Sequence, residues 1–187
     1  MTEAQKILLT NLIEALRQIQ GCLVIAIGAS LSALVLAVPR KRVQLELEPE
    51  LTTIVTKIEA KPELANISIP GMSVPLSPSI AQAVLLLLTL VMGILADYAA
   101  DSANDIASQL RSLPSVLAAA STFPSIATSR NLPMRFIPIL APAVFGSLAV
   151  CLQLLREKAP VTAFLYPLLF IILPYLYLAH ALWHPIS

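Results

Sequence analysis

Residues 136–183 read FIPILAPAVFGSLAVCLQLLREKAPVTAFLYPLLFIILPYLYLAHALW, and this stretch decides the fold. It holds two apolar runs, 136–155 and 161–179, in which no side chain carries a charge. A helix needs about 20 apolar residues to cross a hydrocarbon core of about 30 Å, so each run is long enough to cross a membrane. The link between the runs has only five residues, REKAP. The sequence therefore predicts two antiparallel transmembrane helices.

The composition of the whole chain agrees with a membrane protein. Of its 187 residues, 57% are hydrophobic and 12% are charged. In soluble domains, about 45–50% of residues are hydrophobic and about 25% are charged. The formal net charge of +1 argues against a nucleic-acid partner, which would need a concentrated basic face. We expect the partners to be the lipid bilayer and either other membrane subunits or copies of this chain.

Two further apolar runs lie in the first hundred residues. Residues 21–38, GCLVIAIGASLSALVLAV, are uncharged and are followed by a proline. Ser77 and Pro78 form a typical helix start, a capping residue followed by a first-turn proline, and apolar residues continue from there to Ala96. Helical spacing of apolar residues then persists to Leu113, so this helix should leave the bilayer as an amphipathic stalk.

The first twenty residues have the pattern of an amphipathic helix. Thr2 and Gln5 have the spacing of a capping box, and Leu8, Leu12 and Leu16 follow at helical intervals. Two interpretations are open. The segment is either an interfacial anchor or docking face, or a plain extension of the first crossing.

The connection between the first two crossings favours short strands. Residues 43–48, VQLELE, alternate between apolar and polar side chains, and the segments ANISI (65–69) and MSVPL (72–76) read as short extended pieces. We expect residues 39–77 to form a small structured cap outside the membrane.

These patterns predict an all-α integral membrane protein with four transmembrane helices, an amphipathic N-terminal helix and a small extramembrane cap containing short strands. The predicted order is an amphipathic helix (1–20), the first crossing (21–38), the cap (39–77), the second crossing with its stalk (78–113), an extramembrane connection (114–135), the third crossing (136–155) and the fourth (160–183).

Positive charge predicts the orientation. Seven Lys and Arg residues flank the cap side of the membrane and five flank the other side. Because cytoplasmic loops carry the excess of Lys and Arg, we expect both termini on the non-cytoplasmic side. The membrane would be a bacterial cytoplasmic membrane or an organellar one.

Small residues recur along the first crossing. Small side chains four apart let a neighbouring helix approach closely in lipid. We expect this face to pack inside the bundle, with a contact between copies as the alternative. Its members are Ala26, Gly28, Ala29, Ser30, Ser32 and Ala33.

Five residues near one membrane face form the candidate site. Asp97, Asp101 and Asp105 recur every fourth residue and so share one side of the stalk, where a cation would relieve their repulsion. His180 and His184 are also four apart, a spacing that binds transition metals. The favoured interpretation is a solvated acidic side of the stalk and ordinary interfacial histidines. The alternative is a metal site formed by these five residues.

Two prolines in the fourth crossing, Pro167 and Pro174, lie on one helical face. Each frees a backbone carbonyl one turn earlier. Kinked packing against a neighbouring helix is the favoured interpretation, and a carbonyl-lined ion or ligand site is the alternative.

The sequence contains no catalytic or nucleotide-binding motif that we recognise, so we expect a protein that is not an enzyme and has no cofactor beyond a possible metal ion. The favoured function is a non-catalytic subunit or scaffold of a larger membrane complex. The alternatives are a small homo-oligomeric pore or membrane-permeabilising effector, and a membrane metal-binding protein.

Overall fold

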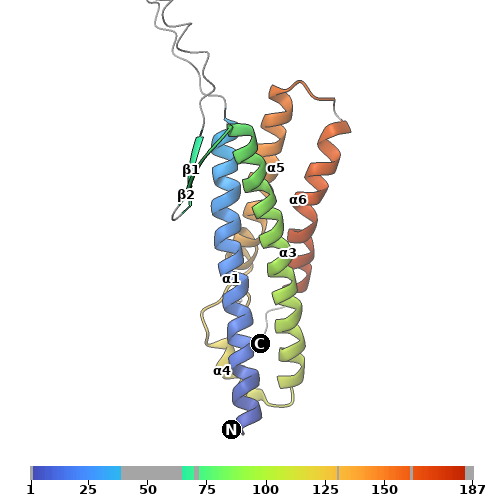
Figure 1. Ribbon diagram of the computed structural model, residues 1–187. Coiled ribbons are helices and arrows are strands. Elements are labelled where there is room, and N and C mark those ends of the chain that lie inside the picture. The colour runs from blue at the N-terminus through green and yellow to red at the C-terminus, as the bar shows by residue number, and fades with distance from the viewer. Residues whose placement is uncertain (1, 39–64, 70–71, 130, 161, 184–187) are drawn as a thin grey trace, which may run out of the picture.

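The computed structural model describes residues 2–38, 65–69, 72–129, 131–160 and 162–183. Within this part of the chain, four long helices form an antiparallel bundle (Figure 1). The helices are α1 (Glu3–Ala37), α3 (Pro78–Leu110), α5 (Leu132–Arg156) and α6 (Thr162–Ala181), and a short helix α4 (Pro114–Ser121) connects α3 to α5. Over the described residues, these four are the helices long and apolar enough to cross a membrane.

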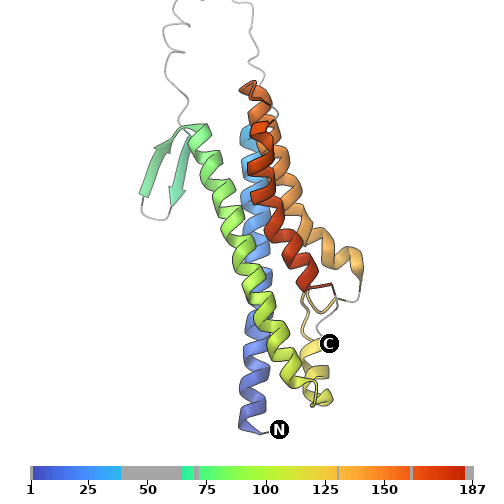
Figure 2. The same cartoon turned by 90° about the vertical axis from the view of Figure 1, so that its right-hand side faces the viewer.

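The two ends of the bundle differ. We call the end that contains the C-terminus of α1, the N-terminus of α3 and the α5–α6 link the upper end, as it is drawn in Figure 1. The lower end contains the N-terminus of α1, the C-terminus of α3 and α4. Helices α5 and α6 stop well above the lower ends of α1 and α3, and α4 lies beyond them (Figure 2).

Helix α1 is one uninterrupted helix of 35 residues. It begins with the predicted capping box: the Gln5 N–H donates to Thr2 Oγ1 at 3.4 Å, and the Thr2 N–H donates to Gln5 Oε1 at 2.9 Å. Leu12, Leu16 and Ile19 are fully buried in a core shared with α3 and α4. The first twenty residues are therefore continuous with the first apolar run, and the burial of these three side chains favours the interpretation as an extension of the first crossing. The interpretation as an interfacial anchor or docking face stays a prediction.

Helix α3 confirms the predicted start and length of the second long helix. The Ser77 hydroxyl accepts from the Ile80 N–H at 3.4 Å, and Pro78 occupies the first turn. The helix then runs 33 residues without a break. It ends at Leu110, three residues before the expected end, because a turn leads into Pro114, which starts α4.

The core is largest in the middle and at the lower end. Its fully buried members include Leu12, Leu23, Ile139 and Leu182, with alanines of α3 between them. At the upper end the buried apolar residues are small, namely Ala33, Ala37 and Ala149. Large buried side chains thus pack the helices together in the middle and at the lower end. At the upper end the buried side chains are small, and polar groups fit between the helices.

A two-stranded antiparallel hairpin precedes α3. Strand β1 (Ala65–Ile69) pairs with β2 (Met72–Leu76) so that Ala65 lies opposite Leu76 and Ile69 opposite Met72. The two predicted extended segments are therefore present, but the described residues of the predicted cap form no more than this hairpin; residues 39–64 of the cap lie outside the described part of the chain. The hairpin stands beside the start of α3 (Figure 2) and covers no face of the bundle. The strand expected at 43–48 lies outside the described residues.

Candidate functional site

The structure places four of the five candidate metal ligands, Asp97, Asp101, Asp105 and His180, in the lower half of the bundle without gathering them. Asp101 and Asp105 are exposed on α3, Asp97 is half-buried, and His180 is exposed in the last turn of α6. No group of three or more His, Cys, Asp or Glu side chains forms among the described residues. His184 lies outside them, so a site that depends on it stays a prediction.

The side chain of α3 that reaches α6 is an amide rather than an acid. Asn104 Nδ2 donates to the Ala181 carbonyl at 3.0 Å. The last four carbonyls of a helix have no partner within the helix, so this hydrogen bond satisfies one of them. Asn104 lies between Asp101 and Asp105 in the sequence, but it occupies a different side of the helix, which faces α6.

Arg135, in the first turn of α5, is buried with 1% of its surface exposed. One terminal nitrogen, Nη1, donates to the carbonyls of Leu182 at 3.1 Å and Trp183 at 2.8 Å. Nε and Nη2 donate to the Ser129 carbonyl, the former at 2.9 Å. A cation at a helix C-terminus also meets the negative end of the helix dipole.

Together, Asn104 and Arg135 satisfy three successive carbonyls at the end of α6. We call these two residues the α6 clamp. It ties α3, α5 and the segment before α5 to one point. In the sequence, Arg135 directly precedes the third apolar run. No local pattern relates it to Leu182 and Trp183, which lie 47 and 48 positions away.

The α3–α6 contact is close and partly polar. Tyr175 is fully buried, and its hydroxyl donates to the Thr89 carbonyl of α3 at 2.6 Å. A Cβ added at Gly93 would lie 3.0 Å from the Tyr175 ring and 3.1 Å from Cβ of Pro174. Pro174 therefore lies in a helix contact, as the packing interpretation expects. The carbonyl-lined site stays a prediction.

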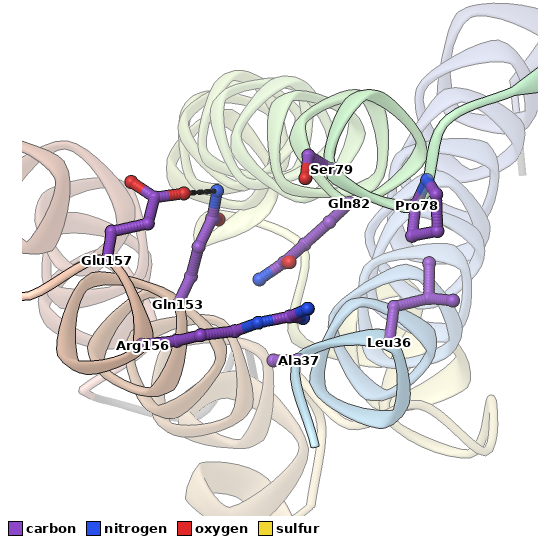
Figure 3. Close-up of a pocket in the computed structure, with 8 residues that line it drawn as sticks. All are labelled: Leu36, Ala37, Pro78, Ser79, Gln82, Gln153, Arg156 and Glu157. Carbon is purple, nitrogen blue, oxygen red and sulfur yellow. Dashed lines mark hydrogen bonds between the residues drawn. The ribbon is translucent and has the colours of Figure 1, made fainter. Parts of the chain in front are cut away.

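A polar cavity of about 170 Å³ lies at the upper end, between the C-terminal ends of α1 and α5 and the N-terminal end of α3 (Figure 3). Gln82 is almost fully buried, and its Nε2 donates to the Ala149 carbonyl at 3.2 Å. The Arg156 side chain extends across the cavity toward Gln82 (Figure 3). The lining residues are Leu36, Ala37, Pro78, Ser79, Gln82, Gln153, Arg156 and Glu157.

Sequence reasoning missed this cavity. In the sequence, Gln82 is a single polar residue within an apolar run, and Arg156 begins the five-residue link between two apolar runs. The sequence feature that could have indicated a polar site is the glutamine within an apolar run, because a buried amide needs hydrogen-bond partners. Gln82 and Arg156 lie far apart in the sequence, and the packing of the helices brings both to the same cavity.

Comparison of the chain with known protein families, with curated proteins and with solved structures found no match in any of the three. Function is therefore argued from the residues of this chain. The α6 clamp lies toward the lower end of the bundle and the polar cavity lies at the upper end.

Proposed function

We propose that this chain is a non-catalytic, multi-pass integral membrane protein that packs as a subunit into a larger membrane assembly. The observation that carries the proposal is the apolar outer surface of all four long helices. Large hydrophobic side chains point outward on each of them, for example Val24 at 68%, Ile94 at 53%, Ile137 at 67% and Phe170 at 63% exposure. Exposed apolar surface on this scale marks a membrane or protein contact.

The lengths of the helices fit a bilayer with an extension on one side. At about 1.5 Å per residue, α1 and α3 are each about 50 Å long, which exceeds a hydrocarbon core of about 30 Å. The excess lies at the lower end, where α1 carries Glu3, Lys6, Glu14 and Arg17. We propose that the apolar upper part of the bundle crosses the membrane and that its lower end projects into water.

The outer face of α1 is the docking surface that the proposal favours. An added Cβ at Gly21 or Gly28 would meet no atom within 4 Å. Ser32 is exposed, and its hydroxyl folds back onto the Gly28 carbonyl at 2.8 Å. Small residues of this kind let a second helix come close when lipid removes the hydrophobic driving force.

The small residues of α1 thus divide between two faces. Ala26, Ala29, Ser30 and Ala33 are buried in the bundle, as expected, whereas Gly28 points outward with Ser32. The expectation that all six lie on one packing face is wrong, because residues three or four apart share a side of a helix and residues two apart do not.

The orientation remains part of the proposal. The upper end carries Arg156 and Lys158. The sequence between α1 and β1, which lies outside the described residues, contains five more Lys and Arg residues. By the positive-inside rule the upper end faces the cytoplasm, and both termini lie on the other side of a bacterial cytoplasmic membrane or an organellar one.

The two alternative functions are weaker. A pore between copies would need polar outer faces, whereas Ser30, Gln82 and Thr89 are buried within a single chain. A metal-binding protein predicts stoichiometric metal that is lost in the His180→Ala variant. That function stays a prediction.

Native mass measurement in mild detergent tests the subunit proposal. We expect the chain purified from its own membrane to carry further subunits of different mass. Gly28→Leu should release them, because overpacking a close helix contact costs about 1–3 kcal/mol. Val144→Phe, which adds bulk to the 59% exposed side chain of α5, should retain them. Masses that are only multiples of one chain, or a complex that survives Gly28→Leu, would contradict the proposal.

A further inference from the structure

The polar cavity at the upper end combines a free cation with donors from two helices. The Arg156 guanidinium forms no ion pair and no hydrogen bond with the residues that the structure describes. Its side chain nevertheless extends into the cavity instead of pointing away from the bundle (Figure 3). A planar guanidinium presents paired N–H groups that match the oxygens of a phosphate.

The N-terminus of α3 supplies the second part of the site. Ser77 caps this helix, Pro78 occupies its first turn, and Ser79 lines the cavity. Pro78 has no N–H, and the N–H groups of Ile80 and Ala81 donate to Ser77. Among the described residues, the Ser79 N–H is therefore the first-turn donor that remains for a ligand, at the positive end of the helix dipole. Both features favour an anion next to Ser79 and the Arg156 guanidinium.

Gln82 supplies the third part. It is 4% exposed, and the hydrogen bond from Nε2 to the Ala149 carbonyl holds its amide at the base of the cavity. An amide nitrogen has two N–H groups, so one remains for a ligand. A buried amide with a second N–H group, beside a guanidinium that pairs with none of the described residues, fits a small acceptor group with several oxygens.

One acidic residue, Glu157, lines the same cavity, and its charge predicts in which direction a substitution changes anion binding. Glu157 Oε1 accepts from Gln153 Nε2 at 3.2 Å, which holds the carboxylate on the side away from the Arg156 guanidinium (Figure 3). A negative charge there weakens the binding of any anion. Its removal should therefore strengthen anion binding, while removal of the Arg156 cation should weaken it.

We propose that this cavity binds the phosphate group of a phosphate ester, held by Arg156, Gln82 and the N-terminus of α3. A cavity of about 170 Å³ is smaller than the roughly 300–1,000 Å³ of pockets for drug-sized ligands. It therefore takes the phosphate and its ester linkage rather than a whole large molecule. The phosphate comes from a phospholipid headgroup or from a soluble ester. The inference does not depend on the subunit proposal.

Binding to the purified, delipidated full chain tests the inference. The probes are glycerol 3-phosphate, phosphatidylglycerol in nanodiscs, and diacylglycerol in nanodiscs as a lipid without phosphate. Native mass spectrometry and thermal shift report binding. We expect wild type to bind a phosphate-bearing probe and to ignore diacylglycerol. Binding of glycerol 3-phosphate identifies a soluble ester, and binding of phosphatidylglycerol alone identifies a lipid headgroup.

Three variants assign the binding to the cavity. Arg156→Gln should weaken binding by roughly tenfold or more, because a charge-assisted pair of hydrogen bonds is lost. Glu157→Gln should strengthen it. Lys158→Gln removes the neighbouring exposed cation, which does not line the cavity, and should leave binding unchanged. Equal losses in Arg156→Gln and Lys158→Gln, weaker binding by Glu157→Gln, or equal binding of diacylglycerol would each overturn the inference. Circular dichroism checks that all three variants keep their helices.

Discussion

Replacing Arg135 with methionine should lower the free energy of unfolding by about 3 kcal/mol or more. The guanidinium is 1% exposed and donates to the carbonyls of Ser129, Leu182 and Trp183. Methionine keeps much of the volume and removes every donor. Each buried carbonyl left without a partner costs about 1–3 kcal/mol.

Two effects oppose each other in this substitution. Burying a charge is costly, and replacing a complete buried ion pair with apolar residues is often neutral or stabilising. Here the partners are backbone carbonyls, which no side-chain substitution removes. The free-energy cost of leaving these carbonyls unpaired is therefore larger than the gain from no longer burying the guanidinium charge.

The control for Arg135→Met is Arg111→Met, because Arg111 is an exposed arginine at the end of α3. Thermal and denaturant unfolding in the same detergent compares the two variants. We expect Arg111→Met to unfold like wild type and Arg135→Met to unfold well before it. Arg135→Lys should recover little, since one ammonium group lacks the fork that reaches Ser129 and the end of α6 together. Equal stability of Arg135→Met and Arg111→Met would contradict the α6 clamp.

Gly93→Val should separate α3 from α6 and cost about 1–3 kcal/mol of stability. The first added carbon would already lie 3.0 Å and 3.2 Å from two atoms of the Tyr175 ring and 3.1 Å from Pro174. These neighbours are rigid. The ring is fully buried and its hydroxyl is hydrogen-bonded to Thr89, so it has no free direction in which to move.

Gly28→Val is the matched control for this second prediction. It makes the same substitution within a long helix, but an added Cβ at Gly28 meets nothing within 4 Å. Both variants therefore share the change in helix propensity and differ only in packing. In unfolding measurements on the chain alone, we expect Gly28→Val to stay near wild type. A Gly93→Val variant as stable as Gly28→Val would show that α3 and α6 do not approach as closely as described.

The helices were largely predictable because their signals are local. Apolar runs gave the long segments, and the caps at Thr2 and at Ser77 with Pro78 gave two helix starts correctly. The continuity of α1 was not predictable from the first twenty residues. The apolar residues of an amphipathic helix have the same spacing whether lipid or another helix covers them. The first twenty residues alone therefore do not show that the C-terminal half of α3 packs against them.

The sites were less predictable because they depend on distant pairs. A spacing of four residues places Asp97, Asp101 and Asp105 on one side of a helix, but it does not say what that side meets. Asn104, one position before Asp105, meets the end of α6 instead. Arg135 and Arg156 each flank an apolar run in the sequence. Nothing local shows that Arg135 donates to carbonyls at the end of α6 or that Arg156 extends into a cavity beside α3.

Cysteine labelling in sealed membranes tests the central claim most directly, namely that four helices cross the bilayer and leave the N-terminus of α1 and helix α4 on one side. Cys22 and Cys151 are both free thiols. Cys22→Ala and Cys151→Ala would remove them, and single exposed cysteines would then be introduced for a membrane-impermeant reagent.

Glu3→Cys and Ser115→Cys mark the lower end, Lys158→Cys marks the upper end, and Val144→Cys marks the outer face of α5. We predict that one side labels Glu3→Cys and Ser115→Cys, that only the opposite side labels Lys158→Cys, and that Val144→Cys stays unlabelled from both sides until the membrane is dissolved. Labelling of Glu3→Cys and Ser115→Cys from opposite sides, or of Val144→Cys in intact membranes, would contradict the account.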